Sequence, residues 1–273
     1  MSLATLQRDI AKLREAIRQH QPPTHPTLDR IRTDPAALMT LAGLSPDPWQ
    51  RRLLSCPSPR TLLLCSRQAG KSTASASLAL LTALVQPAAL VLLLSPSLRQ
   101  SVELFRKVVA QYRAVGKPVG TVRETALALE LANGSRVISL PGTEATIRGF
   151  SGATLLIIDE ASRVPDDLYR TVRPMLAVSQ GRLVGLSTPF VQAGWFYTAW
   201  TGKESWDRVM VKATDCPRIS PAFLAEERSA MGPRWYRMEY ECSFEDAVGA
   251  VFDAESIRAA VCDDLPPLRL GVQ

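Results

Sequence analysis

The sequence has no apolar run that approaches the roughly 20 residues of a membrane-spanning helix. Its N-terminus is polar and lacks the apolar core of a signal peptide, so we expect an intracellular protein without a membrane partner. Its five cysteines are odd in number and form no C-x-x-C pair. This pattern argues against a disulfide framework and against a structural zinc site.

The charge balance is basic, with a formal net charge of +6 over 273 residues, and most of the basic residues are Arg. Such a balance suits a polyanionic partner, because the guanidinium group binds phosphate with two parallel hydrogen bonds. Arginines spread over a solvated surface would give the same net charge. Charge alone therefore favours nucleic-acid contact only weakly.

The strongest motif starts at Cys65 and reads Cys-Ser-Arg-Gln-Ala-Gly-Lys-Ser-Thr. It follows the apolar run 61–64 and precedes a helix expected over 74–85, which is the strand–loop–helix order of a phosphate-binding P-loop. Backbone N–H groups at the helix start would cradle phosphate oxygens, Lys71 would reach the β- and γ-phosphates, and Ser72 would bind Mg²⁺. Cys65 stands where the motif usually has Gly. The residues expected at the nucleotide are Ser66, Arg67, Gln68, Ala69, Gly70, Lys71, Ser72 and Thr73.

A second motif consists of the apolar residues 155–158 followed by Asp159 and Glu160. A buried strand there would deliver two carboxylates to its C-terminal edge. One carboxylate can hold Mg²⁺ while the other orients or deprotonates the attacking water. Together the two motifs predict a site that hydrolyses a nucleotide.

Ser187 and Thr188 follow the next expected strand, and Pro189 comes directly after them. In a parallel sheet their hydroxyls would lie beside the Mg²⁺ and the γ-phosphate, where they could sense the γ-phosphate. The alternative is an ordinary turn that Pro189 closes.

Trp49 and Gln50 precede the P-loop strand and are candidates for a base clamp, because a Gln amide can both donate to and accept from adenine. A core Trp beside a surface Gln is the alternative.

Two arginines are candidates for contact with the transferred phosphate. Arg67, inside the loop, could touch the γ-phosphate of its own chain or brace the loop against a carboxylate. Arg148 lies in a stretch with Gly149 and Gly152 and could act in trans as an arginine finger. It could equally be one surface Arg among many.

Periodicity predicts an α/β fold with a mostly parallel sheet and helices on both faces. Its ligand is expected at the C-terminal strand edges. Asn133-Gly134 predicts a hairpin turn. The expected strands are 61–64, 89–94, 127–131, 136–140, 155–158 and 182–186, and the expected helices are 3–20, 74–85, 98–114 and 166–178.

Composition divides the chain into four segments. Residues 1–44 are expected to form an N-terminal helical extension, and 45–194 the P-loop core. Four of the five Trp residues lie in 195–235, which indicates a small lid subdomain over 195–262. The tail 263–273 reads as a linker and the opening of a strand, so we expect the chain to stop before a second domain.

Several short segments in order resemble the large terminase subunits of tailed bacteriophages over roughly residues 45–260. They are Arg67-Gln68-x-Gly70-Lys71-Ser72, Asn133-Gly134-Ser135-Arg136, Arg148-Gly149, Asp159-Glu160-Ala161, Ser187-Thr188-Pro189, Gly194-x-Phe196-Tyr197, Cys216-Pro217-Arg218-Ile219-Ser220 and Glu239-Tyr240-Glu241-Cys242-x-Phe244. Each piece is short, but the combination is specific.

The resemblance implies an additional-strand (ASCE) P-loop ATPase core with a small lid, and ATP and Mg²⁺ as its ligands. It implies Lys71 and Ser72 on the phosphates and Mg²⁺, Asp159 at the metal and Glu160 as catalytic base. It also implies Ser187 and Thr188 as the coupling motif. Arg148 matches the position of an arginine finger supplied by a neighbouring subunit.

The same resemblance implies partners: double-stranded DNA, a portal protein, a small terminase subunit and other copies of the chain in a ring. The work would take place in the cytoplasm of the infected bacterial host. Family members usually continue into a nuclease domain, and this chain stops where that domain would begin. We therefore expect an isolated motor domain without nuclease activity.

The DNA-facing surface is the least defined part. Its candidates are Arg99, Arg106, Arg123 and Arg136, because they fall outside the expected ATP site.

Two other functions remain open. A helicase would need a second P-loop-like lobe, for which 195–273 are too few residues. A non-catalytic assembly module would account for Cys65 in place of Gly and for the amphipathic N-terminal helix.

Overall fold

One eight-stranded sheet organises the chain. The computed structural model describes residues 25–142 and 149–245, so the predicted helix 3–20, the tail 263–273 and Arg148 lie outside the described residues. The strand order is β3-β4-β5-β2-β6-β7-β1-β8. The strands are β1 Arg60–Cys65, β2 Leu90–Ser95, β3 Thr121–Glu124, β4 Ala128–Leu131, β5 Arg136–Pro141, β6 Leu155–Asp159, β7 Arg182–Ser187 and β8 Asp207–Val211.

Strand direction follows the predicted fold class. From β5 to β8 all neighbouring strands run parallel, whereas β4 is antiparallel to β5 and β3 is antiparallel to β4. The predicted hairpin at Asn133-Gly134 is confirmed as the β4–β5 connection, and Gly134 supplies the positive φ of its turn. β7 lies between β1 and β6. This inserted strand is the additional strand that the resemblance implies.

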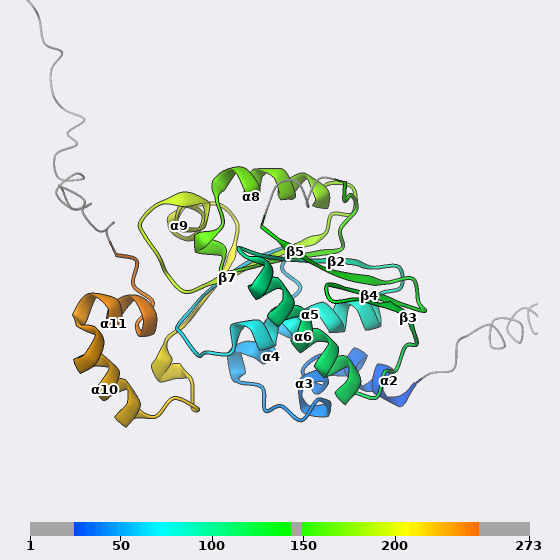
Figure 1. Ribbon diagram of the computed structural model, residues 1–273, viewed down its shortest axis with the longest axis horizontal. Helices are drawn as coiled ribbons and strands as arrows, with labels where there is room; N and C mark the ends of the chain where they lie inside the picture. The colour runs from blue at the N-terminus through cyan, green and yellow to red at the C-terminus, as the bar shows by residue number, and fades with distance from the viewer. Residues whose placement is uncertain (1–24, 143–148, 246–273) are drawn as a thin grey trace, which may run out of the picture.

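Alternation along the strands separates two apolar clusters, one on each face of the sheet. Leu63, Val91 and Ile157 pack on one face, and Leu62, Leu92 and Ile158 on the other. The first face is covered by α5 and α6, with α2, α3 and α4 outside them, and the second by α8 and α9 (Figure 1). The helices are α2 Pro26–Thr33, α3 Ala37–Leu41, α4 Pro48–Ser55, α5 Lys71–Val85, α6 Leu98–Ala114, α8 Asp166–Val172 and α9 Gly194–Thr201.

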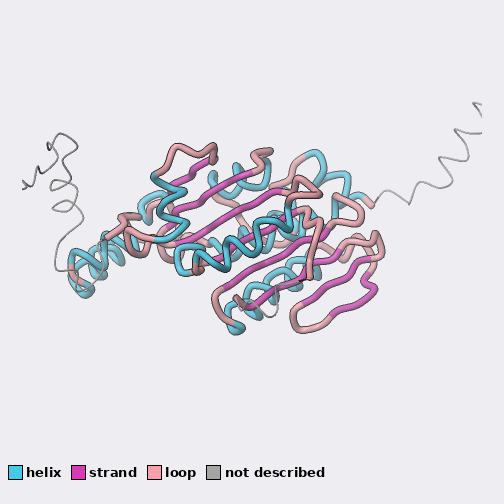
Figure 2. The backbone as a smooth tube through the Cα atoms, turned by 90° about the horizontal axis from the view of Figure 1, so that it is seen from above, coloured by secondary structure: helices cyan, strands magenta, loops and turns pink. Residues whose placement is uncertain are grey.

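The segment predicted as a lid divides into two parts in the structure. α9 packs against the sheet, and β8 pairs with β1, so the sheet extends past the predicted boundary at residue 194. Beyond β8, the helices α10 Pro221–Met231 and α11 Pro233–Tyr240 share a separate small core of Ala213, Leu224, Tyr236 and Tyr240. This helical pair projects from one end of the molecule (Figure 2).

Two edge strands and one helix end differ from the sequence expectation. Every residue of β3 is exposed, and most residues of β8 are half-buried. Neither strand therefore carries the apolar run of a buried strand. The helix expected over 166–178 ends at Val172 and continues as the 3₁₀ turn Arg173–Leu176, because Pro174 lacks the N–H that an α-helix needs. Two further 3₁₀ turns are η1 Ala161–Arg163 and η3 Ala213–Asp215. Of the helices in the described ranges, none has the length and apolarity to cross a bilayer.

Candidate active site

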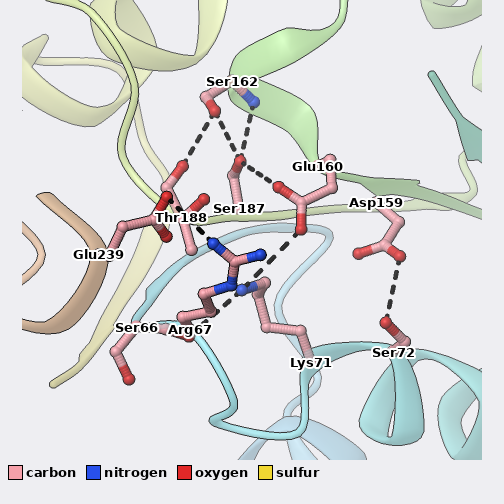
Figure 3. Close-up of polar contacts among 10 residues, drawn as sticks. All are labelled: Ser66, Arg67, Lys71, Ser72, Asp159, Glu160, Ser162, Ser187, Thr188 and Glu239. Carbon is pink, nitrogen blue, oxygen red and sulfur yellow. Dashed lines mark hydrogen bonds and ion pairs between the residues drawn. The ribbon is translucent and has the colours of Figure 1, made fainter. Parts of the chain in front are cut away.

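The predicted catalytic side chains meet at the C-terminal edge of three adjacent strands. The loop after β1 carries Lys71 at the start of α5, β6 ends in Asp159, and β7 ends in Ser187 (Figure 3). The strand order β6-β7-β1 places these three ends side by side.

The loop between β1 and α5 turns through left-handed backbone at Gln68 (φ 61°) and Gly70 (φ 91°). Cys65 is the last, fully buried residue of β1, where the backbone is extended and requires no glycine. Burial raises the pKa of its thiol far above the usual range, so Cys65 is not a nucleophile. The departure from the usual P-loop pattern therefore leaves the shape of the loop intact.

Lys71 is nearly buried, with 8% of the residue exposed. Its Nζ donates to the carbonyl oxygen of Ser66 at 3.2 Å and lies 4.0 Å from Oε1 of Glu160. The ammonium group therefore lies inside the loop, between the backbone that would cradle phosphate and the second carboxylate of β6.

Ser72 and Asp159 form the candidate Mg²⁺ site. The Ser72 hydroxyl donates to Oδ2 of Asp159 at 3.4 Å, and Oδ1 has no hydrogen-bond partner among the described residues. Burial, and after it the negative charge of Glu160, raise the pKa of Asp159 to about 6 against the opposing positive charge of Lys71. A desolvated carboxylate with a free oxygen beside a hydroxyl fits Mg²⁺, which prefers oxygen ligands and takes few from the protein. No cluster of three metal-binding side chains occurs within 25–142 and 149–245.

Glu160 is held by strained backbone and by the end of β7. Its φ of 50° and ψ of 45° lie in the left-handed region, which costs a non-glycine residue roughly 1 kcal/mol or more. Ser187 donates its hydroxyl to Oε2 of Glu160 at 3.5 Å. The strain aims the carboxylate back across the sheet edge toward Lys71.

Ser162 is a site residue that the sequence analysis missed. Its hydroxyl lies 2.7 Å from that of Ser187 and donates to the Thr188 carbonyl at 2.9 Å, while its N–H donates to the Ser187 hydroxyl at 3.2 Å. Ser187 can donate its single proton either to Ser162 or to Glu160. The predicted sensor Ser187 is thereby linked to the predicted base Glu160. The only sequence signal for Ser162 was its position three residues after Asp159.

Arg67 contacts a carboxylate, the second of its two predicted roles. Its Nη1 lies 3.8 Å from Oε1 of Glu239 in α11, and its backbone N–H donates to the Glu239 carbonyl at 2.7 Å. The Arg67 side chain is 58% exposed, so this ion pair contributes little to stability.

The predicted base clamp is only partly brought to the site. Trp49 packs in the core and does not line the hollow of about 500 Å³ beside the loop, whereas Gln50, Gly70 and Thr73 do. The Gln50 amide is already engaged: Oε1 accepts the Asp47 N–H at 2.9 Å, and Nε2 donates to the Gly70 carbonyl at 3.5 Å. Trp49 thus has the position of the core alternative.

The four DNA-binding candidates are exposed but fall into two groups. Arg99 and Arg106 lie on α6, where Arg106 pairs with Glu103 at 2.7 Å. Arg123 and Arg136 lie on β3 and β5 and flank the intervening strand β4. Two of the four candidates therefore lie on a helix and two on strands of the sheet.

Comparison with known proteins supplies a family and a fold. The family model described as terminase large subunit, T4likevirus-type, N-terminal matches residues 62–259. The large terminase subunit of Escherichia phage T5 is 28% identical over 234 residues, which cover 80% of this chain and 52% of the T5 protein. The chain thus spans about half the length of the curated relative it matches.

Two solved structures share the fold. The ATPase domain of the Thermus phage P74-26 large terminase has a TM-score of 0.66 at 20% identity, covering 76% of this chain and 96% of that domain. The large terminase of a thermophilic bacteriophage, in complex with ATP-gamma-S, has a TM-score of 0.58 at 12% identity and covers 72% and 52% respectively. At these identities the likeness concerns the fold alone.

Proposed function

This chain belongs to the T4likevirus-type family of terminase large subunits, and we propose that it hydrolyses ATP with Mg²⁺ to move double-stranded DNA into a viral capsid. The observation that carries the proposal is the meeting of Lys71, the Ser72–Asp159 pair and Glu160 at one sheet edge. A related large terminase was solved with ATP-gamma-S, which supports ATP as the nucleotide.

Each side chain has a distinct task in the proposed hydrolysis. Lys71 leaves the Ser66 carbonyl for the β- and γ-phosphates, and Ser72 and Asp159 hold Mg²⁺. When bound, Mg²⁺ neutralises charge that develops on the phosphate oxygens. Glu160 orients the attacking water and accepts its proton, because its carboxylate lies close to Lys71 and hence to the γ-phosphate.

Coupling to movement would pass through β7. The Ser187 hydroxyl can donate to Glu160 or to Ser162. A change at the γ-phosphate that moves Glu160 therefore changes the hydrogen bonds of Ser187 and of the Thr188 backbone. Arg148 remains our candidate for the arginine finger and lies outside the described residues, and Arg67 is proposed to brace the loop.

The proposed partners follow from the family. They are double-stranded DNA, a portal protein, a small terminase subunit and further copies of the chain in a ring, in the cytoplasm of the infected host. The phosphate contacts of Arg99, Arg106, Arg123 and Arg136 remain proposals. Across the described ranges there is one sheet with one phosphate loop, so nothing there favours the two-lobed helicase alternative.

The test is steady-state ATP turnover by the wild type, Lys71→Ala and Glu160→Gln. Lys203→Ala is the matched control, because Lys203 is exposed and far along the chain from the loop. We expect both site variants to lose turnover by about 100-fold or more and the control to match the wild type. Unchanged turnover in Lys71→Ala would refute the ATPase.

Ring assembly is tested by the same assay at several protein concentrations. A rate per subunit that rises with concentration would show that a neighbour completes the site. A constant rate would place every catalytic group in one chain and would count against the finger in trans.

A further inference from the structure

Arg218 reaches from the segment between η3 and α10 back to the phosphate loop. Its Nη1 donates to Oδ1 of Asp47 at 2.7 Å, and its Nη2 donates to the Ala69 carbonyl at 3.1 Å. Asp47 is only 7% exposed, so it anchors the guanidinium group from a buried position. One planar side chain thus joins three parts of the chain that are distant in sequence.

Gln50 makes a matching contact on the next peptide of the loop. It lies beside Arg218 and donates Nε2 to the Gly70 carbonyl at 3.5 Å. A Cβ added at Gly70 would lie 2.9 Å from Nε2 of Gln50 and 3.3 Å from Nη2 of Arg218. The two side chains therefore close over Gly70, which also needs glycine for its φ of 91°.

These contacts fix the direction of two consecutive peptide groups. In a trans peptide the C=O and the following N–H point in opposite directions. Holding the Ala69 carbonyl toward Arg218 therefore points the Gly70 N–H away from it. The Gly70 carbonyl accepts the Ala74 N–H at 3.1 Å, the first hydrogen bond of α5, and Nε2 of Gln50 adds to that hold, so the N–H of Lys71 points away from both. These N–H groups stand at the start of α5, where a phosphate would be received.

We propose that Arg218, anchored by Asp47 and assisted by Gln50, is a positioning residue that keeps the N–H groups of the phosphate cradle directed at the phosphates. This role rests on the proposed ATP site. It makes phosphate affinity depend on the segment that leads into α10 and α11. It also gives Gln50 a task on the backbone of the loop in place of the base.

The deciding experiment compares two ligands that share phosphates but not a base. Calorimetry measures the Kd of Mg²⁺–ADP and of Mg²⁺–pyrophosphate for the wild type, Arg218→Ala and Arg228→Ala. Arg228 is the matched control, an exposed arginine of α10 that packs over Tyr236. We expect Arg218→Ala to raise both Kd values by the same factor, about tenfold, with unchanged stoichiometry, and Arg228→Ala to change neither.

A rise in the Kd of ADP alone would overturn the role, because it would make Arg218 a base contact in the neighbouring hollow. Equal Kd values for Arg218→Ala and the wild type would overturn it too. A wild type that binds neither ligand would instead refute the proposed ATP site itself. If Arg218→Ala loses binding stoichiometry through misfolding, Arg218→Lys replaces it. A lysine keeps the charge but lacks the fork that serves two acceptors, so we expect a smaller, still equal rise for both ligands; full wild-type affinity there would overturn the role.

Discussion

Replacing Asp159 by Asn should stabilise the ligand-free chain at neutral pH while removing its proposed metal ligand. Asp159 is 5% exposed, and its Oδ1 has no hydrogen-bond partner among the described residues. An ionised carboxylate there is desolvated and faces the negative charge of Glu160. Asn keeps the shape and removes the charge.

The size of the effect follows from the pKa. The folded value of about 6 lies above the ordinary value of 3.8, so the folded state holds the proton more tightly. Below about pH 4 Asp159 is protonated in both the folded and the unfolded state, so its burial does not lower the free energy of unfolding. As the pH rises from about 4 to 6 the unfolded state ionises first, and the wild type loses roughly 3 kcal/mol relative to Asp159→Asn.

The assay is urea unfolding at several pH values without Mg²⁺ or nucleotide. The control is Asp167→Asn, which removes a carboxylate whose side chain is 80% exposed and should give a curve parallel to the wild type. Adding Mg²⁺–ADP should reverse the order, because ligand at about 1,000 times its Kd stabilises the wild type by about 4.1 kcal/mol, which exceeds the difference of roughly 3 kcal/mol. Parallel pH curves for the wild type and Asp159→Asn would refute the reasoning.

Two further predictions concern the hydroxyl link and the packing of β7. Ser162→Ala should lower ATP turnover about tenfold and leave the Kd of Mg²⁺–ADP unchanged, because it releases the Ser187 hydroxyl but removes no proposed phosphate contact. Ser162→Thr keeps a hydroxyl and should restore turnover. A changed Kd in Ser162→Ala would contradict this reasoning. Gly181→Ala should lower the free energy of unfolding by about 3 kcal/mol, because the new Cβ would lie 2.0 Å from the Ala153 carbonyl oxygen. Gly120→Ala, whose Cβ has ordinary contacts, should change it little in the same urea titration, and equal midpoints for the two variants would count against the predicted clash.

The sequence predicted the central strands and the residues at their ends because both depend on local signals. Continuous apolar runs marked β2 and β6, which are buried on both faces. The loop at Gly70-Lys71 and the pair Asp159-Glu160 follow such runs directly. Since parallel strands end at one edge of the sheet, these motifs alone were enough to predict that the two carboxylates lie beside the phosphate loop.

The contacts that brace this site depend on residues far apart in the chain, and no local pattern marks them. Glu239 meets Arg67 only because α11 returns to the end of β1. Asp47 meets Arg218 across most of the chain. The edge strand β8 was missed because its residues are half-exposed and lack an apolar run.

The position of β1 in the sheet has a consequence for biosynthesis. Among the strands in 25–142 and 149–245, β1 leaves the ribosome first, yet its two neighbours leave last: Arg60 pairs with Leu183 in β7, and Thr61 pairs with Asp207 in β8. The backbone N–H of Arg67, in the phosphate loop, donates to the carbonyl of Glu239, which is synthesised later still. A nascent chain that ends before β7 thus carries the whole phosphate-loop sequence without the two strands that flank β1. At the proposed site, nucleotide therefore cannot guide the early folding of this chain, because the loop is complete only after α11 has been made.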